Sequence, residues 1–317
     1  MSRIFDALQR SAIEQSGIEY PDAVSVATEV FEAMPEPAMP DAVTANLGEA
    51  LREIPVATVV AEAPTLETLK PEITVIDKAK NAAADFPSLH VSVTSASRLV
   101  FFSEPDSLAA EKFRFLAVRL LQFRQRRTLK KVLVTSSIPE EGKSLVAANV
   151  AGALARRKER VLLLEGDLRR PVQAQQFGLG RLAGLGEWLL SGEQTVSNIY
   201  HLGGPGFWLM PAGDPPPNPL ELMQSGRLSP LMSQLSNMFD WIIVDSPPLL
   251  PLADTTVWSR MTEGTLLVTR EGKTEKGALE KALEAIKTSD LLGVVLNGCS
   301  NPDHDNYYQR YSPPAKK

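Results

Sequence analysis

A short apolar segment that leads into a Gly-Lys-Ser triplet constrains this chain more than any other feature. Residues 131–136 have strand character, a tight turn follows, and Gly142, Lys143 and Ser144 open a helical segment. A helix that starts this way points backbone N–H groups at a phosphate, while lysine adds charge and serine can bind Mg²⁺. The pattern predicts a strand, a phosphate-binding loop and a helix. A chance triplet is the alternative, because Ser137 stands where the usual pattern has glycine.

Apolar and amphipathic segments alternate along the rest of the chain. Strand patterns occur near 131–136, 160–164, 206–210, 240–245, 264–270 and 292–297, and helix patterns near 104–126, 143–157, 184–190, 219–238, 254–261 and 274–288. Continuous apolar runs such as 161–164 and 241–244 are typical of strands that are buried on both faces. We therefore expect an α/β fold, with a mostly parallel sheet flanked by helices and ligands bound at the carboxyl ends of its strands.

Acidic residues follow two of these apolar strands directly. Glu165 and Asp167 come after one strand, and Asp245 ends another. Mg²⁺ is usually held by one or two carboxylates together with phosphates and water. Phosphoryl transfer needs mainly positioning and charge neutralisation. If the strands are neighbours, these carboxylates converge on the γ-phosphate of a nucleotide; ordinary turn and strand-end carboxylates are the alternative.

The region before the predicted fold differs in composition. Residues 19–72 carry eleven acidic and two basic residues, and no aromatic residue lies between Phe31 and Phe86. Such a stretch buries too little apolar surface to offset its chain entropy. We predict a short amphipathic helix at 1–18, a disordered acidic linker at 19–95, one nucleotide-binding domain at 96–300 and a flexible tail at 301–317. Alternatives are a small helical subdomain around Leu47–Ile54 and an N-terminal helix that packs on its own domain instead of docking a partner.

The sequence also indicates the cellular compartment in which the protein works. A single cysteine, Cys299, excludes an intrachain disulfide framework and suits a reducing cytoplasm. No apolar run approaches the length of about 20 residues that spans a bilayer, and the N-terminus lacks the apolar core of a signal peptide. We therefore expect a cytoplasmic chain that reaches a membrane only through a partner.

Taken together, these motifs resemble those of the bacterial tyrosine kinases of capsule and exopolysaccharide export, in particular their separate cytoplasmic kinase chains. This family belongs to the P-loop superfamily, beside the ParA/MinD ATPases. The resemblance covers roughly residues 97–311. The matching segments are the Walker A segment at 135–144, a second Walker motif at 165–171, a Walker B region at 245–248 with Ala253 and Asp254, a loop at 218–222 and a last core strand at 293–297.

The resemblance implies a protein-tyrosine kinase that uses ATP and Mg²⁺. Lys143 would neutralise phosphate charge, and Arg169 would orient the carboxylates or contact phosphate. Glu165 or Asp167 would accept the tyrosine proton. The implied metal ligands are Ser144, Asp167 and Asp245, and the implied nucleotide contacts are Ser137, Glu141, Gly142, Lys143, Ser144 and Leu145.

The resemblance also implies partners. Tyr307, Tyr308 and Tyr311 resemble the tail tyrosines that such kinases phosphorylate on one another, the alternative being rings that pack on the surface. Glu111 and Arg114 resemble an oligomer contact whose next arginine is Ala117 here, the alternative being a solvated i,i+3 ion pair. We expect a homo-oligomer, a membrane-embedded polysaccharide chain-length regulator as activator, a cognate tyrosine phosphatase and no nucleic-acid partner.

Two positions depart from the family pattern. Residue 140 is glutamate where the family often has glycine, and we expect strain there if its φ is positive. Residue 165 is glutamate where the family has aspartate, which moves the carboxylate outward by one methylene. Mg²⁺ demands near-octahedral geometry, and a displacement of about 1 Å can cost roughly 10²-fold in rate.

Three functions from different classes remain. The first is an active tyrosine autokinase that controls polysaccharide polymerisation or export. The second is a regulatory subunit whose ATP-dependent association matters more than catalysis, and the third is a partition- or division-type ATPase. The first is favoured over the third because Ser137 stands where those ATPases place a signature lysine, and because they lack a terminal tyrosine cluster.

Overall fold

The computed structural model describes residues 86–91, 93, 98–250, 252–286 and 290–299. The predicted helix at 1–18, most of the predicted linker and the tail with Tyr307, Tyr308 and Tyr311 lie outside the described residues. Among the helices of the described part, none combines the length and the hydropathy that a membrane span requires.

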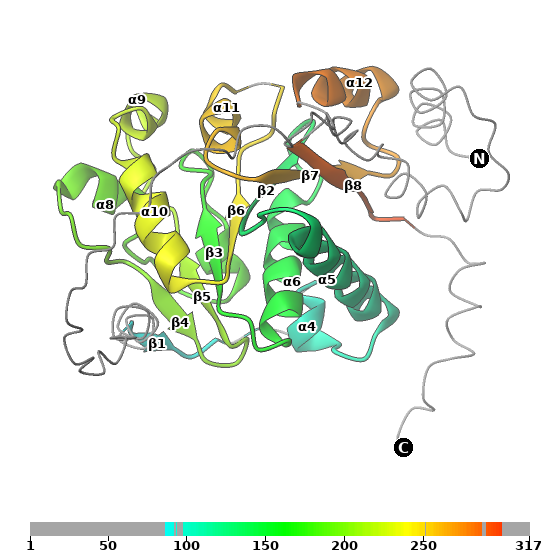
Figure 1. Cartoon of the computed structure of the whole chain (residues 1–317), viewed down its shortest axis with the longest axis horizontal. Coiled ribbons are helices and arrows are strands. Elements are labelled where there is room, and N and C mark those ends of the chain that lie inside the picture. The colour runs from blue at the N-terminus through cyan, green and yellow to red at the C-terminus, as the bar shows by residue number, and fades with distance from the viewer. Residues whose placement is uncertain (1–85, 92, 94–97, 251, 287–289, 300–317) are drawn as a thin grey trace, which may run out of the picture.

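Within the described residues, eight strands form one sheet in the order β1-β4-β5-β3-β6-β2-β7-β8 (Figure 1). Their bounds are Ser88–Leu89 (β1), Lys131–Ser136 (β2), Val161–Glu165 (β3), Tyr200–Leu202 (β4), Phe207–Met210 (β5), Trp241–Asp245 (β6), Gly264–Arg270 (β7) and Leu291–Asn297 (β8). Neighbouring strands are parallel except β4 and β5, which form an antiparallel pair. The expected mostly parallel α/β fold is thus confirmed.

Helices cover both faces of this sheet. The elements are Val100–Ser103 (α4), Leu108–Arg126 (α5), Lys143–Ala155 (α6), Gln173–Gln176 (α7), Leu185–Ser191 (α8), Pro219–Met223 (α9), Leu228–Met238 (α10), Asp254–Ser259 (α11) and Lys276–Ala285 (α12). Helices α5 and α6 pack together (Figure 1), and α6 also contacts β2, β3 and β6. Most of α6 is therefore buried, which explains its run of small apolar residues.

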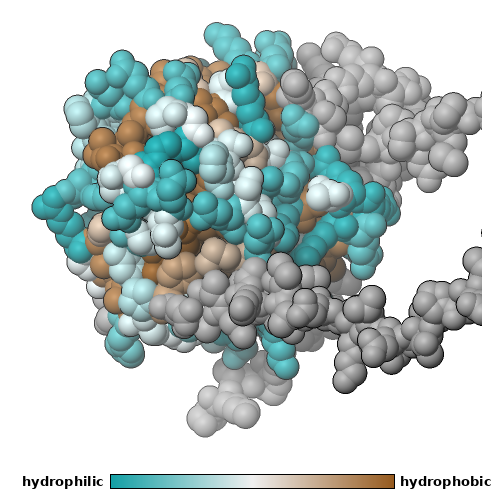
Figure 2. Space-filling model, turned by 60° about the vertical axis from the view of Figure 1, so that its left-hand side comes forward, coloured by the Kyte–Doolittle hydropathy of each residue, from teal (hydrophilic) through white to brown (hydrophobic). Residues whose placement is uncertain are grey.

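The strands supply apolar side chains to both layers, as strands buried on two faces do. On β2, Val132 and Val134 pack in the cluster that contains α5 and α6. Leu133, between them, packs with Leu162 and Leu164 in a second cluster beneath α8, α9, α10 and α11. The apolar residues are thereby drawn inward, and the face turned forward in Figure 2 mixes hydrophilic and hydrophobic side chains.

Three sequence-based boundaries were wrong. The expected linker reached residue 95, but Ser88–Leu89 form β1, and Leu89, Val91 and Val93 pack on the core. The long helix begins at Leu108 instead of 104, because Ser107 caps it by accepting a hydrogen bond from the Ala110 N–H at 3.2 Å. The single helix expected at 219–238 is two helices, α9 and α10, and Gly226 lies between them with a φ of +83°.

Candidate active site

The loop between β2 and α6 is held in shape by the side chain of Glu141, which is fully buried. Its Oε2 accepts a hydrogen bond from the Ile138 N–H at 2.9 Å, and its Oε1 accepts one from the Thr274 hydroxyl. The amide of Asn297, at the end of β8, donates to the Glu141 carbonyl at 2.8 Å. Glu141 was expected to contact nucleotide, but its carboxylate faces the loop interior, where it organises the backbone.

Positive φ angles shape the outer turn of this loop. Gly142 caps α6 with a φ of +95°. Glu140 has a φ of +66°, so the predicted backbone strain at this non-glycine residue is present. Its carboxylate pairs with Lys273 at 2.6 Å, and Arg270 donates to its carbonyl at 3.2 Å. These contacts with Arg270, the last residue of β7, and with Lys273 just after it hold the strained residue in place.

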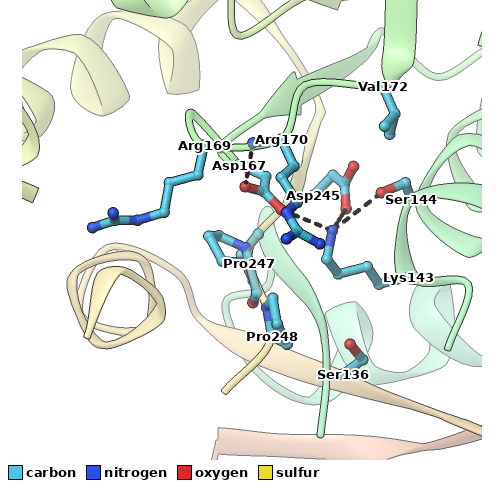
Figure 3. A network of polar contacts seen from close by, with 12 residues as sticks. Ser136, Lys143, Ser144, Asp167, Arg169, Arg170, Val172, Asp245, Pro247 and Pro248 are labelled. Carbon is cyan, nitrogen blue, oxygen red and sulfur yellow. Dashed lines mark hydrogen bonds and ion pairs between the residues drawn. The ribbon is translucent and has the colours of Figure 1, made fainter. Parts of the chain in front are cut away.

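The carboxyl ends of three adjacent strands bring the predicted charged residues together. Lys143 Nζ lies 3.0 Å from Asp167 Oδ2 and 3.8 Å from Asp245 Oδ1. The Ser144 hydroxyl is 3.3 Å from the same nitrogen. Figure 3 shows these four side chains converging. The convergence follows from the order β3-β6-β2, because β6 pairs with both β3 and the strand that precedes the loop.

A cavity of about 480 Å³ opens in front of this cluster. Its walls include Gly142, Lys143, Ser144 and Leu145 from the loop and α6, together with Asp167, Arg170 and Pro248. Ser137, an expected nucleotide contact, does not line this cavity. It is fully buried, and its hydroxyl has no hydrogen-bond partner in the part of the chain that the structure describes.

Burial and charge oppose each other in this cluster. Desolvation raises the pKa of Asp245, which is fully buried, against the opposing effect of Lys143. Burial alone would lower the pKa of Lys143, but the carboxylates of Asp245 and Asp167 outweigh it, and the pKa lies above its usual value. One lysine thus faces two carboxylates, an arrangement of charge that a bound cation would complement.

The donor set fits Mg²⁺ shared with phosphates. Asp245 Oδ1 is buried and accepts no hydrogen bond within the described residues, so it is available to a metal or its water. The hydroxyl of Ser144 and the carboxylate of Asp167 lie on either side of Asp245, around the Lys143 amine (Figure 3). No cluster of three or more His, Cys, Asp or Glu side chains suited to a metal occurs in the described ranges. A site of one or two carboxylates completed by phosphate and water is what Mg²⁺ favours.

Glu165 lies apart from this cluster, which differs from the expected convergence of three carboxylates. Its carboxylate accepts hydrogen bonds from the backbone N–H groups of Val172, of Gln173 at 2.7 Å and of Ala212 at 2.9 Å. It lines a second cavity, of about 290 Å³, on the far side of Val172. Desolvation raises the pKa of Glu165 to about 7, although the three backbone donors favour its charged form.

The raised pKa of Glu165 makes stability depend on pH. A carboxyl whose pKa is 4.5 when unfolded and about 7 when folded contributes stability that is complete below pH 4.5. That contribution is lost as the pH rises through 7, and it amounts to about 3 kcal/mol. We therefore expect the urea-unfolding free energy of the nucleotide-free protein to fall from pH 5 to pH 8, with a shallower fall in Glu165→Gln. Equal slopes for the two proteins would contradict the assignment.

Arg169 was expected to orient the carboxylates or to contact phosphate; it lines the cavity in front of Lys143, but its guanidinium binds Asp254 and not these carboxylates. Its Nε and Nη2 donate to the two carboxylate oxygens of Asp254 at 2.7 and 3.1 Å. Asp254 opens α11, so this pair joins the loop after β3 to that helix, and Arg169 extends away from Lys143 (Figure 3). The neighbouring Arg170 lines the cavity and donates its backbone N–H to Asp167 at 3.1 Å. Sequence reasoning passed over Arg170, although the doubled arginine was the available signal.

Sequence reasoning also missed Gln173, the first residue of α7. This side chain is fully buried, and its amide lies between Ser144 and Asp245. No sequence motif identifies a glutamine eight residues after a strand as part of a functional site.

The expected oligomer contact is an ion pair within one chain. Arg114 and Glu111 pair as i,i+3 neighbours on α5, and their side chains are 32% and 58% exposed. Arg114 also donates to the Pro105 carbonyl at 2.5 Å and lies over the Phe101 ring at 5.9 Å, so this arginine is half-buried, whereas Glu111 is exposed.

Comparisons with known proteins agree on one family. No protein-family model matches the chain. The chain is 37% identical over 216 residues to tyrosine-protein kinase YwqD of Bacillus subtilis, covering 66% of this chain and 89% of that protein. It is 31% identical over 189 residues to tyrosine-protein kinase CpsD of Streptococcus agalactiae, covering 57% and 82%.

Two solved structures are also similar to this chain. The chimeric protein CapA2B2 matches with a TM-score of 0.61 and 29% identity, covering 71% of this chain and 99% of that one. The kinase domain of the Escherichia coli tyrosine kinase ETK matches with a TM-score of 0.57 and 28% identity, covering 64% and 82%.

Proposed function

The chain belongs to the bacterial tyrosine-protein kinases and is a protein-tyrosine kinase, and from this premise we propose that it phosphorylates its own tail tyrosines in trans. The observation that carries the proposal is the meeting of Lys143, Ser144, Asp167 and Asp245 at the carboxyl ends of adjacent strands, where the first three line one cavity and the buried Asp245 lies behind Lys143. The donor nucleotide is ATP, and the acceptors are Tyr307, Tyr308 and Tyr311.

In the proposed mechanism, Lys143 leaves the two carboxylates and binds the β- and γ-phosphates, where its charge offsets that of the transferred group. Gly142 and the residues after it present backbone N–H groups at the start of α6. Ser144 and Asp245 would hold Mg²⁺, with Asp167 beside them, and Mg²⁺ would neutralise developing phosphate charge. Arg170 lines the same cavity and adds a second positive charge.

Asp167 is the better candidate to accept the tyrosine proton. It lines the cavity and contacts Lys143, whereas Glu165 faces a second cavity and is bonded to three backbone N–H groups. A general base must lie within hydrogen-bond reach of the proton that it takes. Once phosphorylated, a tyrosine carries nearly two negative charges, and repulsion by the carboxylates of Asp167 and Asp245 favours release of the tail.

We further propose that the kinase acts in capsule or exopolysaccharide export, with a membrane-embedded chain-length regulator as activator and a cognate phosphatase that resets it. Residues 1–18 are the proposed docking segment, and the acidic stretch at 19–85, before β1, is the proposed tether to the kinase domain. The exposed Glu111 and the half-buried Arg114 on α5 are the proposed contact between copies. The resemblance of the motifs to this class of kinases supports these assignments.

A mixing experiment tests phosphorylation in trans. Lys143→Met keeps the tyrosines but is expected to lose catalysis, whereas a triple Tyr→Phe variant at 307, 308 and 311 keeps catalysis but lacks acceptors. Incubated alone with Mg-ATP, neither should yield phosphotyrosine in the tail. Mixed, they should place phosphate on the Lys143→Met chain, which mass spectrometry distinguishes by its tyrosine-containing peptide.

Two results would count against the proposal. A wild-type chain that carries no phosphate on these tyrosines, with or without the activator's cytoplasmic segment, would remove the autokinase function. A wild type that is phosphorylated while the mixture stays unmodified would show transfer within one chain instead of between chains.

A further inference from the structure

The buried amide of Gln173 connects the loop helix to the strand that carries Asp245. Its Nε2 donates one hydrogen bond to Asp245 Oδ2 at 2.8 Å and another to the Ser144 carbonyl at 3.0 Å. Both hydrogens of the amide are thus used, and the side chain is fully buried. Its own backbone N–H donates to Glu165 Oε1 at 2.7 Å, which fixes the start of α7. One residue therefore touches three elements that meet at the site.

The orientation of this amide follows from its neighbours. The two atoms that it faces, a carboxylate oxygen and a backbone carbonyl, are both acceptors. A flipped amide would set its oxygen against both of them, so only the donor orientation satisfies the network. The amide oxygen then has no hydrogen-bond partner in the described chain, a cost that the two donated bonds offset.

As a result, the two carboxylate oxygens of Asp245 have different hydrogen-bond environments. Oδ2 is occupied by Gln173, whereas Oδ1 accepts no hydrogen bond among the described residues and faces Lys143 at 3.8 Å. Rotation of the carboxylate would break the bond to Gln173 and bury a second unpaired oxygen. Gln173 therefore leaves one defined oxygen facing Lys143, which lines the cavity, as partners behind metal ligands do.

We propose that Gln173 is a positioning residue that fixes the Asp245 carboxylate and the first turn of α6 in register, so that Asp245 Oδ1 and the Ser144 hydroxyl face one Mg²⁺. This inference rests on the proposed function, because it takes these two residues as the ones that hold the metal. Gln173 touches neither metal nor nucleotide itself.

The test separates metal-dependent from metal-independent nucleotide binding in the full chain. The probe is the fluorescent nucleotide N-methylanthraniloyl-ADP, titrated once in excess EDTA and once at a series of Mg²⁺ concentrations. Gln173→Met keeps an unbranched side chain of similar size but removes both donors. We expect its Mg²⁺ concentration for half-maximal enhancement of binding to rise about 10- to 100-fold. Its affinity in EDTA should stay within about 3-fold of wild type, because Lys143 and the loop backbone are unchanged.

Two further variants sharpen the comparison. Gln173→Asn keeps both donors on an arm that is shorter by one methylene, and an intermediate rise in the Mg²⁺ requirement is expected. Gln175→Met makes the same chemical change two residues along α7, at an exposed position, and should leave both titrations unchanged. If Gln173→Met does not fold, as judged by circular dichroism, Gln173→Asn decides the question by the same two titrations.

The possible outcomes are distinguishable. An unchanged Mg²⁺ requirement in Gln173→Met, or in Gln173→Asn if that variant decides, overturns the inference. So does an equal loss of affinity with and without Mg²⁺, since that is the mark of a purely structural role. A wild type that binds no nucleotide under either condition overturns the proposed function instead.

Discussion

Replacing Asp245 by asparagine is expected to lower the rate of tyrosine phosphorylation by about 10²- to 10³-fold while making the nucleotide-free protein more stable. The loss of rate follows if Asp245 helps to hold Mg²⁺. The gain in stability follows from the charges, because Lys143 faces two carboxylates and Asp245 is the fully buried one, whose pKa burial raises. Removing its charge leaves Lys143 paired with Asp167 at 3.0 Å and should stabilise the fold by about 1 kcal/mol.

The neighbouring Asp240 provides the matched control for this prediction. It lies just before β6 and forms a one-to-one pair with Arg160, with Nη2 2.7 Å from Oδ1 and Nε 3.0 Å from Oδ2. Asp240→Asn should therefore lower stability by about 1 kcal/mol and leave phosphorylation unchanged. The measurements are thermal unfolding without nucleotide and phosphotyrosine formation. A clear loss of stability in Asp245→Asn would show that Lys143 more than offsets the cost of burying that carboxylate.

Replacing Gly142 by alanine is expected to weaken nucleotide binding by at least about 10-fold and to destabilise the fold by about 2 kcal/mol. Gly142 has a φ of +95°, where alanine is strained. A Cβ there would also lie 2.1 Å from Asn297 Nδ2, the atom that donates to the Glu141 carbonyl. Asn297 would have to move, and the loop would lose its contact with β8. Calorimetry with ATP and thermal unfolding measure the two effects.

Gly277 is the control for the alanine substitution. It lies in the first turn of α12, and an added Cβ would meet no atom within 4 Å. Gly277→Ala should raise stability by about 0.5–1 kcal/mol through helix propensity and leave nucleotide affinity unchanged. If Gly142→Ala behaved like Gly277→Ala, the loop would not depend on its contact with Asn297.

The sequence predicted the strands that carry the site because each is a continuous apolar run. Residues 131–136 and 264–270 were bounded as β2 and β7 are. The short β4 was missed, since only Leu202 of its three residues is buried and the strand exists through pairing with β5. The break between α9 and α10 was missed because the apolar period continues across Gly226.

The sequence predicted those site residues whose positions follow from the ends of neighbouring strands, but not the directions of side chains that depend on distant partners. Lys143, Asp167 and Asp245 meet as expected, since their strands are neighbours. The direction of Glu165 was not predictable, because it depends on backbone N–H groups at Val172 and at Ala212, 47 positions along the chain. Arg169 likewise turns to Asp254, 85 positions away. Such long-range partners leave no local pattern in the sequence.

The contacts of Thr274 and Asn297 with Glu141 also determine when, during synthesis of the chain, the phosphate-binding loop can take its shape. The groups that hold Glu141 come from Thr274 and Asn297, and Asn297 follows Glu141 by 156 positions. At about 5–20 residues per second, a ribosome adds that length in about 8–30 s. A growing chain therefore carries its Gly-Lys-Ser triplet long before it carries the residues that give the loop its shape. Competence to bind nucleotide should thus arrive near the end of synthesis, shortly before the tail tyrosines emerge.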